Sequence, residues 1–351
     1  MRKRIALLLL PLLAACSGGG GSGGGTIVTP TPTPAPAPAP SPTPAPVPTP
    51  SPTPAAPPAG PATGSEFFSS IAMLYLTDPN LGTCNAGQLR PEVPERVLYV
   101  LNAIRAEHDL PPVRYAAADE PAAMESALMQ AANRQLSHTP PTSWACYTNA
   151  GAAMSGRANL YIGLGSGLRY VSNDDIVIGW LTDVDNLVAN SVGHRRWLLY
   201  PFLDTIAYGR VAGSSGASDR SDAASLTVIN DDVVTPAGLP PFVAYPFEEY
   251  PARYFDSGAL LSFGVIADPD TPWGDNADVD YSRATVSVRR RGGSALTVTN
   301  LGFDNVGYGL PNNLQFNVAG LAADTIYDVT VSDVDVDGSL RDFTYYFRIV
   351  S

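Results

Sequence analysis

The chain contains almost no lysine. Its one lysine, Lys3, stands between Arg2 and Arg4. Of the 21 basic residues, the remaining 18 are all arginines, and they stand against 33 acidic residues. The formal net charge is therefore −12 for the whole sequence and −15 when Arg2, Lys3 and Arg4 are left out. Nucleic-acid binding and adsorption to anionic lipid both depend on clustered basic residues. This composition argues against nucleic acid as a partner and against adsorption to an anionic membrane surface.

Cysteine is also scarce, with three residues in the chain. If Cys16 is modified as described below, Cys84 and Cys146 remain as an even pair in an oxidising compartment. Such a pair is most simply a disulfide, which here closes a loop of about 60 residues, although two buried free thiols are the alternative. Outside its Gly/Ser-rich stretch the sequence has no G-x-S-x-G motif, and bridged cysteines cannot act as nucleophiles. The sequence therefore offers no nucleophile for a serine or cysteine hydrolase.

Residues 1–15 have the pattern of a secretory signal, with a basic start, the apolar run Ile5–Leu13 and two alanines before Cys16. The apolar run is too short to remain as a membrane-spanning helix. The segment Leu13–Cys16 resembles the lipobox of bacterial lipoproteins, which implies cleavage before Cys16 and lipidation of its thiol. An ordinary signal peptide followed by an unrelated cysteine is the alternative. With Ser17 next, the resemblance implies a bacterial envelope lipoprotein anchored in the outer membrane, with its globular part in the periplasm or at the cell surface.

Residues 16–64 are expected to form a stalk. A Gly/Ser-rich stretch is followed by Thr-Pro and Ala-Pro repeats, so that 16 of the 34 prolines lie between Pro30 and Pro61. Such repeats favour polyproline II, which at about 3.1 Å per residue would span up to ~100 Å. A stalk of this kind is consistent with a chain whose N-terminal end is anchored to the membrane.

The next part of the chain alternates between helix and strand patterns. Apolar residues at helical spacing predict three helices and short apolar runs predict three strands; the helices are Pro94–His108, Ala122–Leu136 and Ile176–Leu187, and the strands are Trp197–Leu199, Ala207–Val211 and Leu226–Ile229. We expect His108 to be a cation that interacts with the dipole at the end of the first helix.

From Pro240 the pattern changes to short strands with turns every 10 to 15 residues, which is typical of a β-sandwich. This part contains no cysteine. Asp333, Asp335, Asp337 and Gly338 match the start of a calcium loop, but Thr344 occupies the position of its final glutamate. Asp-Gly between two alternating strands predicts a hairpin turn instead.

Five segments occur in the order in which a CAP domain has them, the domain of the cysteine-rich secretory, antigen-five and pathogenesis-related superfamily. They are Leu101–Arg105, Ser137–His138, Asn159–Leu160, Trp180 with Asp183, and Gly193–Arg196. The chain resembles the bacterial branch of this family over about 140 residues, from Pro94 to Val234. The resemblance implies an α/β fold: a CAP-type α-β-α layered domain at 65–237, followed by an all-β, immunoglobulin-like sandwich at 238–351.

In that family two histidines and two glutamates converge in a surface cleft, where the histidines can bind zinc or another divalent ion. The matching histidines are His138 and His194, one glutamate corresponds to Asp183, and the other is replaced by Arg157 or Ala158. The implied ligand cleft consists of His138, His194, Asp183, Asn159 and Trp180. His138, His194 and Asp183 could hold a divalent metal with an open position, or they could form a hydrogen-bonded cluster without metal. No cofactor is required.

Arg195 and Arg196 follow His194 directly, and we expect them to form ion pairs with nearby carboxylates, Asp183, Asp185 or Asp204, with anion binding as the alternative.

Two functions are compatible with these residues. The favoured one is a non-enzymatic envelope lipoprotein whose cleft binds an unknown ligand: a lipid, a glycan or a peptide. The alternative is a metal-assisted hydrolase of the periplasm or cell wall, in which a metal-bound water is the nucleophile. The missing second carboxylate would have been its general base, and this loss favours the binding function.

Overall fold

The computed structural model describes residues 66–214, 219–231 and 234–351, which lie within one compact unit of the chain. The expected signal peptide, the lipidation site Cys16 and the stalk lie outside the described residues. Among the helices of the described residues, none combines the length and the apolar character that crossing a membrane requires.

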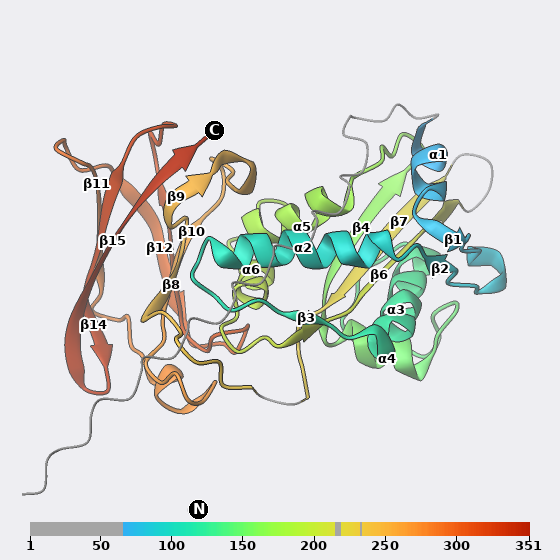
Figure 1. Ribbon diagram of the computed structural model, residues 1–351, viewed down its shortest axis with the longest axis horizontal. Coiled ribbons are helices and arrows are strands. Elements are labelled where there is room, and N and C mark those ends of the chain that lie inside the picture. The colour runs from blue at the N-terminus through green and yellow to red at the C-terminus, as the bar shows by residue number, and fades with distance from the viewer. Residues whose placement is uncertain (1–65, 215–218, 232–233) are drawn as a thin grey trace, which may run out of the picture. The chain divides into compact units, whose positions relative to one another are not determined.

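The N-terminal half of the described chain contains six α-helices and a central three-stranded antiparallel sheet in the order β4-β7-β6 (Figure 1). The helices are α1 (Glu66–Ala72), α2 (Glu92–Ala106), α3 (Glu120–Asn133), α4 (Asn149–Ser155), α5 (Asn173–Thr182) and α6 (Gly193–Leu198). The sheet consists of β4 (Ala158–Gly165), β6 (Tyr208–Ser214) and β7 (Arg220–Thr227). Two small sheets accompany it, formed by β1 (Tyr75–Thr77) with β2 (Gln88–Leu89) and by β3 (Arg114–Tyr115) with β5 (Thr205–Ile206).

Side chains along β6 alternate between two helical layers. Gly209 faces α3, and a Cβ on it would lie 2.2 Å from the backbone of Ala123, so only glycine permits this close approach. The neighbours Tyr208 and Arg210 point to the opposite face, where both bond the Asn173 side chain at 2.9 Å at the start of α5. Because successive side chains of a strand point to opposite faces, α3 and α5 cover the two sides of one sheet. This is the expected α-β-α layering.

The helix α2 packs on α5 and completes the layer on that side. Its buried residues Val97, Val100, Leu101 and Ile104 follow the helical spacing of the apolar pattern. In the same interior, Arg210 and Asp222 form a fully buried ion pair at 2.6 Å.

The C-terminal half is a sandwich of two four-stranded sheets (Figure 1). One sheet has the order β12-β13-β10-β8 and the other the order β11-β14-β15-β9. Their strands are β8 (Phe242–Tyr245), β9 (Glu248–Pro251), β10 (Leu261–Val265), β11 (Thr285–Arg290), β12 (Val298–Asp304), β13 (Asn313–Val318), β14 (Tyr327–Val336) and β15 (Ser339–Val350). Inward aromatic residues, including Phe263, Phe316 and Phe347, fill the space between the sheets. The turn between β14 and β15 has positive φ at Asp337 and Gly338, as a tight hairpin requires, and this confirms the hairpin expected there. Single-turn 3-10 helices lie at Leu81–Thr83, Ala117–Asp119, Ala252–Tyr254 and Gly274–Asn276.

Two local predictions are wrong. The third expected helix ends at Thr182, and Leu187, expected to face inward, is 82% exposed. The expected strand Trp197–Leu199 belongs mostly to α6. A three-residue apolar run is compatible with strand or helix, and only its packing partners decide between them.

Candidate functional site

Asp183 fixes the orientation of His194. It occupies the left-handed position after α5 (φ 58°, ψ 22°) and is 7% exposed. Its Oδ1 lies 2.8 Å from Nδ1 of His194, and its Oδ2 accepts hydrogen bonds from the backbone N–H groups of His194 at 3.1 Å and Arg195 at 3.4 Å. A carboxylate beside Nδ1 selects the tautomer with its proton on that nitrogen. The other ring nitrogen, Nε2, therefore carries the free lone pair.

The same carboxylate also accepts a hydrogen bond from the Asn186 side chain, whose Nδ2 lies 3.0 Å from Oδ1. The backbone N–H of Val188 in turn donates to Oδ1 of Asn186 at 2.8 Å. Both oxygens of Asp183 are thus engaged with donors of its own loop and of α6.

His138 is held in the same way by a different group. Its Nδ1 lies 2.9 Å from the carbonyl oxygen of Ser155, so this nitrogen carries the proton and Nε2 the lone pair. The position of the preceding residue is fixed by Gln130 of α3, which donates to the Ser137 carbonyl at 3.1 Å and accepts from its N–H at 2.8 Å. The His138 side chain is exposed.

One short segment anchors both histidines. The Ser155 carbonyl holds the His138 ring, and the Asn159 side chain donates to the carbonyl of His194 at 3.1 Å. Four residues of extended chain span at most about 14 Å, so the two anchors lie within that distance of each other. Trp180 ties α5 to the same strand, because its Nε1 donates to the Leu160 carbonyl at 3.0 Å.

Asn159 and Trp180 therefore position the site and do not line it. They are 2% and 4% exposed, and their polar atoms bond backbone carbonyls. The resemblance implied that both belong to the cleft, and the structure places them as buried residues that hold its backbone.

The three expected metal ligands do not come together in the described residues. Within the ranges that the structure describes, no three His, Cys, Asp or Glu side chains gather as they would around a metal ion. The third expected ligand, Asp183, already accepts hydrogen bonds at both oxygens. The residues present do not fit a metal held jointly by His138, His194 and Asp183.

Arg195 bonds backbone groups instead of the carboxylates expected as its partners. Its guanidinium is buried and donates to the carbonyls of Leu181, Thr182 and Leu260 at 2.6, 2.7 and 2.6 Å, and to the Ser262 hydroxyl at 3.1 Å. It also lies 3.8 Å from the centre of the Tyr245 ring. Burial lowers its pKa. Leu260, Ser262 and Tyr245 belong to the C-terminal half, so Arg195 joins this half to the backbone directly behind His194.

Arg196 makes a second connection of the same kind. It pairs with Asp304 at 2.8 Å and donates to the carbonyls of Val306 and Leu310 at 2.6 and 3.1 Å. The sequence offered no local signal for either connection, because each hydrogen-bonding partner in the C-terminal half lies at least 65 residues away.

His108 is not the cation expected at the end of the first helix. It is 2% exposed, with Nδ1 2.8 Å from the Ala244 carbonyl and Nε2 3.1 Å from the Tyr250 hydroxyl. Burial lowers its pKa to about 3, and the nearby Arg105 and Arg195 act in the same direction. This imidazole is therefore neutral at physiological pH and belongs to the contact between the two halves.

Cys84 and Cys146 form a disulfide across 62 positions of sequence. A cavity of about 510 Å³ opens beside it, and a much smaller one of about 30 Å³ lies between α6 and the sandwich. Neither cavity is lined by His138 or His194.

Comparison with known proteins agrees with the layered architecture. Residues 98–228 match the model of CAP, the cysteine-rich secretory protein family. No curated protein matches the chain. Among solved structures, an extracellular protein containing an SCP domain from Bacillus anthracis shares 19% identity over 40% of this chain and 44% of its own, with a TM-score of 0.23. The chain thus spans less than half the length of that protein. The N-terminal half, whose sheet lies between helical layers, thus contains the region that matches the CAP family model, residues 98–228, and it is followed by an all-β sandwich.

Proposed function

We propose that the CAP domain binds a ligand at His138 and His194 and catalyses no reaction on it. The observation that carries this proposal is that both rings are fixed through Nδ1, one by Asp183 and the other by the Ser155 carbonyl. In the part of the chain that the structure describes, neither Nε2 has a hydrogen-bond partner of its own. Two orientated acceptors are suited to a ligand that presents hydroxyl or amide donors.

The Asp183–His194 pair resembles the orienting half of a hydrolytic triad, so the absence of a nucleophile matters. Across the described ranges, no serine, threonine or cysteine side chain bonds either histidine ring. A metal-bound water would be the other source of a nucleophile, and the three expected ligands do not gather. Binding therefore accounts for the arrangement better than hydrolysis does.

We further propose that the protein acts at the bacterial cell envelope, anchored by lipid on Cys16 in the outer membrane, with a lipid, glycan or peptide as ligand. The basis for the anchor is the Leu13–Cys16 pattern. A Cys16→Ala variant should move from the membrane fraction to the soluble fraction. Retention of this variant in the membrane would contradict lipid anchoring.

The ligand site is tested by mass spectrometry of small molecules that co-purify with the full chain. The wild type should carry a lipid, glycan or peptide that His138→Ala/His194→Ala loses. Asp185→Ala is the control, because this exposed carboxylate lies two positions from Asp183. Equal retention by the double variant, or no such molecule on the wild type, would contradict the proposal. If the wild type and Asp185→Ala carry a stoichiometric metal and the double variant does not, the hydrolase function would be supported instead.

A further inference from the structure

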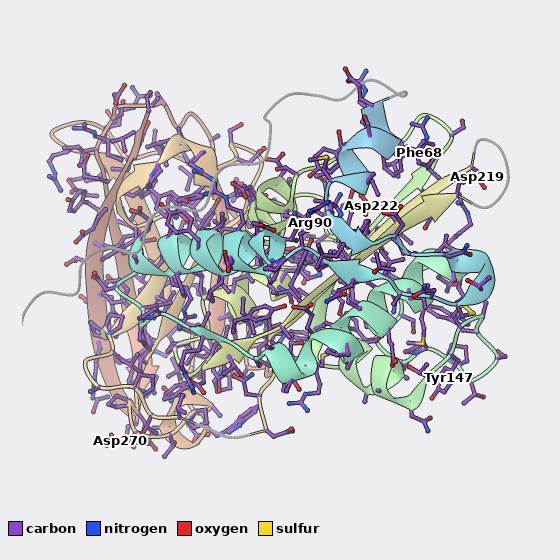
Figure 2. The ribbon with its side chains drawn as sticks, turned by 45° about the vertical axis from the view of Figure 1, so that its right-hand side comes forward. Phe68, Arg90, Tyr147, Asp219, Asp222 and Asp270 are labelled. Atoms are coloured by element: carbon purple, nitrogen blue, oxygen red, sulfur yellow. A yellow bond between two sulfur atoms is a disulfide. The ribbon has the colours of Figure 1, made fainter. Side chains whose placement is uncertain are left out.

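The cavity of about 510 Å³ beside the disulfide has the size of a small-ligand site. Its walls are α3, which contributes Glu125, and the two loops that carry Cys84 and Cys146. The loop after α3 contributes Thr142, Trp144, Tyr147 and Thr148. Tyr147 lies at the periphery of the structure beside α3 and α4 (Figure 2).

This loop is held in place at its middle. The Asn133 side chain accepts from the N–H of Ala145 and donates to its carbonyl, both at 2.9 Å. The preceding residue, Trp144, closes a turn through its N–H to the Pro141 carbonyl at 3.0 Å. The next residue, Cys146, is bonded to Cys84. A loop fixed at three successive residues presents its side chains at little entropic cost on binding.

The end of the loop is fixed by Thr148, which caps α4. Its hydroxyl accepts from the N–H of Gly151 at 3.0 Å and donates to Oε2 of Glu125 at 2.6 Å. The second oxygen of Glu125, Oε1, has no partner among the described residues. The carboxylate is thus orientated with one oxygen available to a ligand.

Besides Thr148, four of the residues that line the cavity carry polar side-chain groups. Oε1 of Glu125 only accepts hydrogen bonds, Nε1 of Trp144 only donates, and the hydroxyls of Thr142 and Tyr147 do both. In the part of the chain that is described, the side-chain polar atoms of Trp144 and Tyr147 have no hydrogen-bond partner. The lining contains two aromatic rings and one carboxylate but no arginine or histidine.

From this lining we infer that the cavity binds a neutral saccharide of one or two pyranose rings. Sugar hydroxyls donate and accept, so one ring can satisfy Glu125 and Trp144 together. The apolar face of a pyranose presents weakly positive C–H groups, which the electron-rich faces of Trp144 and Tyr147 attract.

Other ligand classes fit the same groups less well. A phosphate or an acidic sugar would bring its negative charge close to the Glu125 carboxylate with no cation in the lining. An amine only donates, so it would leave Nε1 of Trp144 without a partner. The saccharide site is separate from the histidine site, since neither His138 nor His194 lines this cavity.

The test is calorimetric titration of the full chain with four neutral probes of two rings each, maltose, cellobiose, mannobiose and N,N′-diacetylchitobiose, and with trilysine as an amine probe. We expect at least one neutral probe to bind. Trp144→Ala should weaken that binding about tenfold, and Trp144→Phe less, because the ring remains. Glu125→Gln keeps the acceptor for Thr148 but loses the charge, and should weaken binding severalfold.

Two controls separate this site from the rest of the molecule. Trp273→Ala removes a tryptophan of the C-terminal half that is 54% exposed, and it should leave affinity unchanged. His138→Ala/His194→Ala should also leave it unchanged, so failure of the histidine site is distinguishable from failure of this one. No binding of any neutral probe, preferential binding of trilysine, or equal losses in Trp144→Ala and Trp273→Ala would each overturn the assignment. If Trp144→Ala does not fold, Trp144→Phe and Glu125→Gln still decide the question.

Discussion

Replacing His108 should remove a specific part of the acid sensitivity of this protein. The imidazole is 2% exposed and donates from Nδ1 to the Ala244 carbonyl, while Nε2 lies 3.1 Å from the Tyr250 hydroxyl. Burial lowers its pKa from 6.5 to about 3, and the positive charges of Arg195 and Arg105 oppose protonation further. The groups facing it are these two guanidinium groups and the rings of Tyr245 and Tyr250.

The direction of the effect follows from proton binding. Below its ordinary pKa of 6.5 the unfolded chain binds a proton at His108, whereas the folded chain does not until about pH 3. Stability is therefore lost as the pH falls through this window. Between about pH 7.5 and about pH 5 the loss is about 2 kcal/mol, since each pH unit below the unfolded pKa is worth about 1.4 kcal/mol.

The assay is urea unfolding of the wild type and His108→Gln across this pH range, followed by tryptophan fluorescence. The glutamine amide keeps a donor for the Ala244 carbonyl but does not titrate. We expect His108→Gln to be the less stable protein near neutral pH, and the gap in unfolding free energy to shrink by about 2 kcal/mol near pH 5. Carboxylates that titrate in both proteins cancel in this difference. Parallel curves for the two proteins would refute a buried, neutral His108.

Three further outcomes follow from the described contacts. Arg195→Met should lower the unfolding free energy by about 3–5 kcal/mol in urea titrations, because buried carbonyls lose their donors, while the exposed Arg283→Met should change it little. Cys84→Ser/Cys146→Ser opens a loop of 62 positions and should cost roughly 4 kcal/mol in the same assay; a loss below about 1 kcal/mol would contradict a formed disulfide. Asp183→Asn places an amide NH₂ group against N–H donors that now bond the carboxylate. It should lower the unfolding free energy by about 1–3 kcal/mol and broaden the His194 ring signals in NMR spectra. Unchanged stability and unchanged ring signals would contradict the orienting role of Asp183.

The sequence was sufficient for the elements whose signal is local. The apolar spacing of Val97, Leu101 and Ile104 predicted α2 because the buried stripe of a helix repeats every three to four residues. Alternating residues in the C-terminal half predicted a sandwich because each strand buries one face. The hairpin at Asp337-Gly338 followed from backbone preferences of two adjacent residues. The order of short motifs also indicated the CAP domain before its layers were known.

Only the tertiary structure decided what the charged and titratable residues do. Arg195 and Arg196 bond groups 65 and 108 positions away, and His108 contacts a carbonyl 136 positions away. No local pattern encodes such partners, since they depend on how the two halves of the chain pack. The same reason applies to Asp183, whose hydrogen bonds engage both oxygens, and to the cavity at Trp144, whose walls come from loops about 60 residues apart. Residue types at the site can be read along the chain, but their burial and their partners are properties of the folded protein.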